Sequence, residues 1–363
     1  MKSTPHSSSR WARVLVILAT SAIGVITLTP GTHSGAVPFT CVGCGGLGLV
    51  EFLWNVMLFV PLGFAIVRTG RTAAAATGWA LGLSVAVEAI QFFAIPSRDA
   101  TVGDLLANGL GGGAGALIGL HIAALLRPPP RLARRLAAVT ATVALVVFGL
   151  TAWLSAPSLP ADPWFGQVAP ELGQYASFPG HVLRATLNRE RVPSTLIGDW
   201  ERLRRVALTD GIVLETRFVT GPPTPALAPI VSVFDARHRR VILLGQDGRD
   251  LRFEVRLRSE EFRLRAPGFI LGQAVLSGAG DTVTVRATFA NGRYLLQVAA
   301  TSRTTARRFT ISPDIGWALI APVDVPLGLT ARLISTIWVI LLVGPPIYYL
   351  RRASISRQPN PVS

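Results

Sequence analysis

Long apolar runs separated by short polar connections occupy both ends of the chain. A membrane-spanning helix needs about 20 mostly apolar residues, and six segments satisfy this requirement. A cleaved signal peptide is the alternative for the first segment, because Arg10 and Arg13 precede its apolar core, although a good cleavage site is lacking. We predict membrane-spanning helices at residues 12–30, 49–67, 73–95, 104–126, 136–156 and 329–350.

Between the fifth and the last of these segments the pattern becomes one of short alternating strands. Residues 212–218, 251–257 and 282–289 alternate apolar with polar or charged side chains, and turn sequences such as Asn291-Gly292 separate the runs. This alternation is typical of antiparallel strands with one face in water. We predict an all-β sandwich of jelly-roll type over residues 211–326. Residues 157–210 form a poorly patterned lead-in, to which we assign no function.

The composition supports a protein that lies partly in a membrane. Only 15% of the 363 residues are charged and 50% are apolar, with a mean hydropathy of +0.46, whereas soluble domains carry about 25% charged residues. The charges concentrate between Pro157 and Pro326, which contain 21 arginines and 16 of the 20 acidic residues. Elsewhere the arginines flank apolar runs, which favours a topological role and argues against a nucleic-acid partner.

The distribution of basic residues predicts the membrane topology. With a cytoplasmic N-terminus, twelve basic residues fall at the inner ends of the spans and only Arg98 falls in a short outer connection, as the positive-inside rule requires. Residues 157–326 are then extracytoplasmic, and the C-terminal tail at 351–363 is cytoplasmic. The twelve inner residues are Lys2, Arg10, Arg13, Arg68, Arg71, Arg127, Arg131, Arg134, Arg135, Arg351, Arg352 and Arg357.

Polar side chains gather toward the predicted outer ends of the second, third and fourth spans. Each of these helices carries an acidic residue with an amide side chain one helical turn away. Polar groups are costly in hydrocarbon, so a set of this kind predicts a site that faces the bundle interior or water. The alternative is structural: these groups pair with one another, and Asp104 is an N-cap or first-turn residue of its helix. The candidates for a polar pocket are Asn55, Glu88, Gln91, Arg98, Asp99, Asp104 and Asn108.

Two further motifs have a structural interpretation. Glycines recur between Gly109 and Gly119 without the lysine of a phosphate-binding loop, a pattern that lets membrane helices pack closely. Cys41 and Cys44 precede the second span, where they form either a disulfide or a pair of thiols. With His33 as the one nearby histidine, a metal site is not expected.

The motifs of the polar segments resemble those of the VanZ-like family over residues 10–126. They are an asparagine before Phe-x-Pro-Leu-Gly, a Glu-x-x-Gln pair, a Pro-x-Arg-Asp loop and an Asp-x-x-x-Asn-x-x-Gly run; Ser97 stands where the family often has glycine. The resemblance implies a bacterial cell-envelope protein, linked in the founding member to lower sensitivity to teicoplanin. The shared polar positions would be the seven pocket candidates, and the Cys41/Cys44 pair also recurs in relatives.

The β region is similar to laminin-G and concanavalin-like jelly rolls over residues 211–312. The resemblance rests on the short segments Ser232-Val-Phe-Asp235 and Leu244-Gly-Gln-Asp-Gly248 and on the later Asn291-Gly292 hairpin. It implies contact with a glycan or with a protein. Candidate aromatic residues for stacking on sugars are Phe269, Tyr294 and Trp317. We expect no cofactor; a calcium ion held by Asp235, Asp247 and Asp250 is the alternative.

Two functions fit these features. The first is an accessory protein of the cell envelope whose outward polar pocket binds a glycopeptide or a lipid-linked precursor, while the β-sandwich contacts cell-wall glycan or a protein. The second is a membrane-embedded enzyme acting on lipid-linked wall precursors, with Glu88 or Asp99 as acid or base and Arg98 holding an anionic group. The lipid bilayer is a partner in both. A proton-coupled transporter is disfavoured, because only His121 is ionisable in the inner half of any span.

Overall fold

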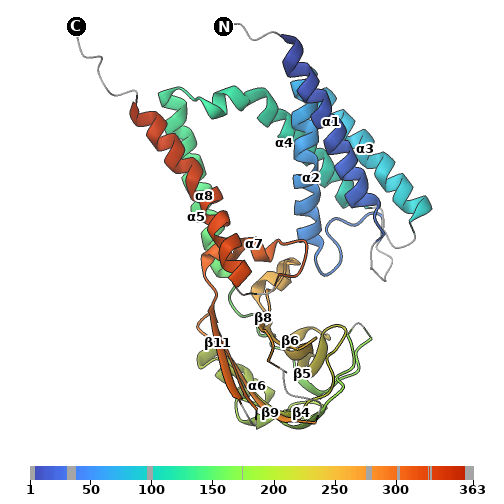
Figure 1. The fold of residues 1–363 in the computed structure, drawn as a ribbon, viewed down its shortest axis with the longest axis vertical. Coiled ribbons are helices and arrows are strands. Elements are labelled where there is room, and N and C mark those ends of the chain that lie inside the picture. The colour runs from blue at the N-terminus through green and yellow to red at the C-terminus, as the bar shows by residue number, and fades with distance from the viewer. Residues whose placement is uncertain are drawn as a thin grey trace. The chain divides into compact units, whose positions relative to one another are not determined.

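The computed structural model describes residues 5–30, 38–95, 101–173, 175–274, 280–300, 303–325, 327 and 329–355. The chain divides into two compact units (Figure 1). The helical unit comprises Met1–Thr142 and Leu342–Ser363, and the β unit comprises Val143–Leu341. Two long helices, α5 (Pro130–Leu154) and α8 (Leu329–Ile355), each contribute one half to each unit.

Among the described residues, six helices are long and apolar enough to cross a membrane. They are α1 (Pro5–Leu28), α2 (Gly48–Arg68), α3 (Ala73–Ala94), α4 (Val102–Leu126), and the helices α5 and α8 given above. Their number and order confirm the prediction of five N-terminal spans and one C-terminal span. Many of their large side chains are exposed, including Trp79, Phe93 and Leu145. An exposed apolar helix surface of this extent is suited to lipid.

Glycines allow α2 and α4 to pack backbone against backbone. A Cβ added to Gly115 would lie 2.0 Å from the Val60 carbonyl oxygen, and one added to Gly63 would lie 1.9 Å from the Gly112 carbonyl oxygen. A Cβ added to Gly111 would lie 2.2 Å from the Val56 carbonyl oxygen. No side chain fits at these positions, as expected for small residues at a membrane-helix interface. This packing fixes α4 against α2 and so brings the polar ends of the two helices together.

The β unit contains two antiparallel sheets (Figure 1). One sheet has five strands in the order β1-β5-β6-β7-β8, and the other has six in the order β11-β10-β9-β4-β2-β3. The strands are β1 (Trp164–Val168), β2 (His181–Leu187), β3 (Glu190–Arg191), β4 (Ile212–Val219), β5 (Ala228–Asp235), β6 (Arg240–Asp247), β7 (Asp250–Val255), β8 (Phe269–Leu271), β9 (Thr282–Ala290), β10 (Arg293–Ala300) and β11 (Arg303–Thr310).

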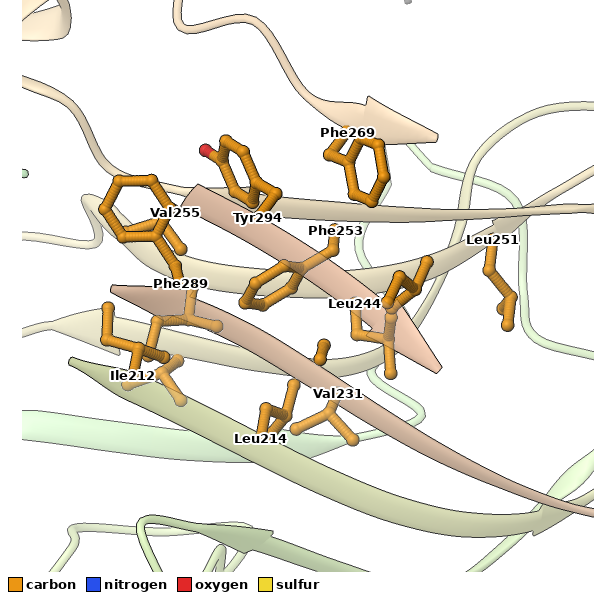
Figure 2. Close-up of a cluster of buried hydrophobic side chains, with 14 of the residues drawn as sticks. Ile212, Leu214, Val231, Leu244, Leu251, Phe253, Val255, Phe269, Phe289 and Tyr294 are labelled. Atoms are coloured by element: carbon orange, nitrogen blue, oxygen red, sulfur yellow. The ribbon is translucent and has the colours of Figure 1, made fainter. Parts of the chain in front are cut away.

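Side chains from both sheets form one apolar core (Figure 2). Leu214 of β4 and Val231 of β5 are fully buried, as are Leu244 of β6 and Phe253 of β7. The alternation in β4, β9 and β10 places every second residue in this core. Burying each such side chain contributes about 1.5–3 kcal/mol to folding. The structure thereby confirms the predicted β-sandwich.

The β-sandwich begins earlier in the chain than the sequence pattern indicates. Residues 157–210 contain β1, β2, β3 and the helix α6 (Trp200–Thr209). β1 adds to the edge of one sheet beside β5, and β2 adds to the other beside β4. The register of β2 shifts between Val182 and Arg184, which interrupts its alternation and explains why the strand is hard to recognise.

The three aromatic residues considered for sugar stacking are buried, so that prediction is wrong. Phe269 and Tyr294 have no exposed surface, and Trp317 is 7% exposed. The rings of Phe269 and Tyr294 stack 5.7 Å apart within the core (Figure 2). Burial also raises the pKa of the Tyr294 phenol above its usual value. Phe269 and Tyr294 occupy the inward positions of β8 and β10, and Trp317 belongs to the short buried helix α7 (Gly316–Leu319).

Candidate functional site

The first turn of α4 is a centre of hydrogen bonding between helices of the helical unit. Thr101 is its N-cap, and its hydroxyl oxygen accepts a hydrogen bond from the Asp104 backbone N–H at 3.1 Å. The same hydroxyl donates to one Asp104 carboxyl oxygen at 2.6 Å. The other carboxyl oxygen accepts from the Asn55 side-chain amide on α2. Asp104 is therefore a first-turn residue of α4, which is one of the two positions that the sequence allowed for it, and Thr101 is the N-cap.

Glu88 joins the third helix to this centre. Its carboxyl oxygen accepts the Thr101 backbone N–H at 3.1 Å, although Glu88 is 13 residues earlier in the chain, on α3. In an ordinary capping box an acidic side chain of the same helix accepts this N–H. Here a neighbouring helix supplies the acceptor. We call the resulting chain of side chains, Asn55, Asp104, Thr101 and Glu88, the polar relay; it links α2, α4 and α3.

A second set of amide side chains lies near the polar relay. The Asn108 side-chain amide, one turn further along α4, donates to the Ser84 hydroxyl of α3 at 2.8 Å. The Asn108 carbonyl oxygen is buried and has no hydrogen-bond partner among the described residues. Gln91 donates to the Thr27 backbone carbonyl at 2.8 Å and thereby connects α3 to the end of α1. A buried polar atom without a partner is rare and often marks a place where a ligand or water binds.

A disulfide loop packs on the start of α4. Cys41 and Cys44 form a disulfide with their Cα atoms 5.9 Å apart. The backbone N–H of Gly103 donates to the Cys41 carbonyl at 3.0 Å, and that of Val102 donates to the Phe39 carbonyl at 2.9 Å. A Cβ on Gly103 would approach the Val42 backbone to 3.1 Å. The loop thus satisfies N–H groups in the first turn of α4, which helices otherwise leave unpaired.

Comparison with known families bears on the same part of the chain. Residues 7–125 match the family model described as VanZ/LLP1. The match covers about a third of the chain, and it includes the whole polar relay and the disulfide loop. It does not extend to the β unit. No curated protein and no solved structure matches the chain.

The region that matches this family model brings most of the predicted site residues together. Asn55, Glu88 and Asp104 belong to the polar relay, Asn108 binds Ser84 close to it, and Gln91 binds the end of α1. Arg98 and Asp99 lie outside the described residues. Sequence reasoning missed Thr101 and Ser84. A Thr-x-x-Asp pattern at the helix start would have indicated the first, and Ser84 stands one turn before Glu88 on the same face.

The described residues contain no group of three His, Cys, Asp or Glu side chains arranged to hold a metal ion. Two of the three aspartates considered for calcium have protein partners. Asp235 accepts hydrogen bonds from the backbone N–H groups of Arg237 and Arg239 and binds the Arg239 side chain at 2.6 Å. Asp250 accepts the Gln273 backbone N–H at 2.7 Å. These carboxylates stabilise turns of the β unit.

The charged residues on the outward face of β7 form a buried network. Glu254 is 3% exposed and pairs with Arg240 at 2.7 Å and with Arg252. Arg252 also pairs with Asp324. Burial alone would lower the pKa of both arginines, but the neighbouring carboxylates more than offset it and raise both pKa values. Every charge in the network has a partner, so we interpret it as structural.

Proposed function

We propose that this protein acts in the bacterial cell envelope and that its VanZ-like region binds a hydrogen-bonding ligand at the polar relay. The single observation that carries the proposal is that three helices join two carboxyl groups, a threonine and an asparagine in one chain of hydrogen bonds. Such groups are expensive in a membrane and are normally retained where they serve a site. The nearby unpaired carbonyl oxygen of Asn108 adds an acceptor for a donor group of the ligand.

We propose further that the polar relay faces the outside of the cell. The relay lies at the C-terminal end of α3 and the N-terminal end of α4, so the connection between these helices is an outer one in the topology that the basic residues favour. In that topology residues 157–326, which contain the β-sandwich, are also extracytoplasmic. This orientation favours ligands of the wall side: a lipid-linked precursor or a glycopeptide such as teicoplanin for the relay, and glycan or protein for the β-sandwich.

The proposal is tested by changing the carboxyl groups without changing their shape. Glu88→Gln removes the acceptor charge that holds Thr101, and Asp104→Asn alters the partner of Asn55. We expect both variants to insert in the membrane and to lose any protection against teicoplanin that the wild-type protein gives to a sensitive strain. Asp314→Asn, in the β unit, is the matched control and should retain full protection. Wild-type protection by both relay variants would contradict the proposal.

A membrane-embedded enzyme is the second candidate, and one observation favours it. Glu88 and Asp104 both bind Thr101, one at its backbone N–H and the other at its hydroxyl, so two carboxyl groups converge on one residue. Paired carboxyl groups can divide acid and base roles between them. Incubation of the purified protein with undecaprenyl-linked precursors separates the two candidates. A chemical change that Glu88→Gln abolishes would support the enzyme, and binding without change would support the first proposal.

A further inference from the structure

The helical unit contains a second feature, an apolar groove between α1, α2 and α3. Its volume is about 950 Å³, and its walls include Ile17 of α1, Leu62 and Ile66 of α2, and Trp79 and Leu83 of α3. None of the polar relay residues lines it. The groove is large enough for a ligand of the size that protein pockets usually take. It is therefore a separate site, and it does not depend on the proposed function.

Two glycines of α3 keep the groove open. A Cβ added to Gly78 or to Gly82 would meet no atom within 4 Å, and both residues line the groove. The glycines between α2 and α4 behave differently, since a Cβ on Gly115 would lie 2.0 Å from the neighbouring backbone. Gly78 and Gly82 thus do not serve close packing of helices. Their effect is to leave unfilled volume along one face of α3.

Arginines stand at one end of the groove. Arg13 of α1 lines it together with Arg71, which lies in the connection between α2 and α3, next to Thr69. Both arginines are exposed, and neither forms an ion pair with another described residue. The guanidinium group suits two-point binding of phosphate oxygens. A basic end on an otherwise apolar groove matches the shape of a lipid with a charged head and apolar chains.

We propose that this groove binds an anionic phospholipid, with the phosphate group between Arg13 and Arg71 and one acyl chain along Gly78 and Gly82. The charge of the two arginines selects the anionic headgroup. Basic residues near an anionic lipid surface each contribute about five-fold in affinity, so two contribute about 30-fold. The apolar lining holds the chain regardless of the headgroup. The arginines therefore determine which headgroup is preferred, and the apolar lining determines whether an acyl chain binds, so substitutions can remove the two effects separately.

The test is native mass spectrometry of the full chain, titrated in detergent with phosphatidylglycerol and, separately, with phosphatidylcholine. We expect phosphatidylglycerol to bind about 30-fold more tightly. Exchanging both arginines, Arg13→Gln with Arg71→Gln, should remove this preference, whereas Arg68→Gln, outside the groove, should leave it unchanged. Gly82→Leu should fill the groove and thereby weaken the binding of both lipids. Gly24→Leu is its control, since Gly24 also has no atom within 4 Å of an added Cβ but does not line the groove.

Several outcomes would overturn the proposal. Equal affinity for the two lipids, or a preference that persists in the double arginine variant, would show that these side chains do not bind the headgroup. Equal losses from Gly82→Leu and Gly24→Leu would show that the groove does not hold the chain. Inorganic phosphate that displaces the lipid at equimolar concentration would indicate an anion site without a chain. If Gly82→Leu fails to fold, the exposed arginines alone decide the result.

Discussion

The close packing of α2 and α4 makes Gly115→Ala the sharpest test of the helical unit. The added methyl group would lie 2.0 Å from the Val60 carbonyl oxygen, where ordinary contact begins at 3.4 Å. Backbone atoms cannot rotate away as a side chain can, so α4 must move from α2 by about 1.4 Å. A shift of that size at the start of α4 would also break the hydrogen bond between Asn55 and Asp104.

The expected magnitude follows from what overpacking costs in well-packed interiors. We predict that Gly115→Ala destabilises the helical unit by about 2 kcal/mol, a factor of about 30 in the unfolding equilibrium constant. Gly119→Ala should cost less, because its added Cβ would lie 3.1 Å from the Phe64 carbonyl oxygen. Gly24→Ala should be neutral or stabilising, since it meets no neighbour and alanine favours helix.

The assay is SDS-induced unfolding of the three variants, followed by far-ultraviolet circular dichroism, which reports mainly on the helices. The order of stability should be Gly24→Ala, then Gly119→Ala, then Gly115→Ala. Equal stability of Gly115→Ala and Gly24→Ala would refute the packing of α2 against α4, and with it the geometry of the polar relay.

Three other predictions concern the β unit and the disulfide loop. Glu254→Gln should cost about 3 kcal/mol in thermal unfolding, because the half-buried Arg240 and Arg252 both lose their carboxylate partner; an unchanged midpoint would contradict the charged network. Burial raises the pKa of Glu260 above its usual 4.5, so the charged form is penalised at neutral pH. Glu260→Gln should therefore stabilise the protein at pH 7, with a gain that vanishes as the pH falls to 4.5; a gain independent of pH would exclude this cause. Replacing Cys41 and Cys44 by serine should lower the free energy of unfolding by about 2 kcal/mol. Reductant should lower the unfolding midpoint of the wild-type protein and leave that of the serine variant unchanged.

The sequence predicted the elements whose pattern is long and regular. The six apolar runs gave six helices, and the alternation in β4, β9 and β10 marked strands that do form. β1 and β2 were missed: β1 is the edge strand of its sheet, and β2 has a bulge between Val182 and Arg184. Such strands are defined by the partner to which they bind, and no local pattern records that partner.

In the candidate site, too, local spacing predicted some features, whereas contacts that depend on helix packing could not be predicted. Helical spacing placed Asp104 and Asn108 on one face of α4, and both face polar partners in the structure. The contact between Glu88 and Thr101 could not be predicted, because it uses a backbone N–H whose position depends on how α3 and α4 pack. The prediction of exposed aromatic residues failed for a related reason: their burial depends on how β8, β10 and the helix that contains Trp317 pack, and composition alone does not record that packing.

The topology is the central claim, because the proposed ligands require the polar relay and the β unit to face outward. Single cysteines at Thr209, the last residue of α6 in the β unit, and at Thr72, between α2 and α3, test it directly in intact cells, since the native pair is a disulfide. A membrane-impermeant maleimide should label Thr209→Cys in intact cells and Thr72→Cys only after lysis. Labelling of Thr72→Cys in intact cells, with Thr209→Cys protected until lysis, would contradict the account.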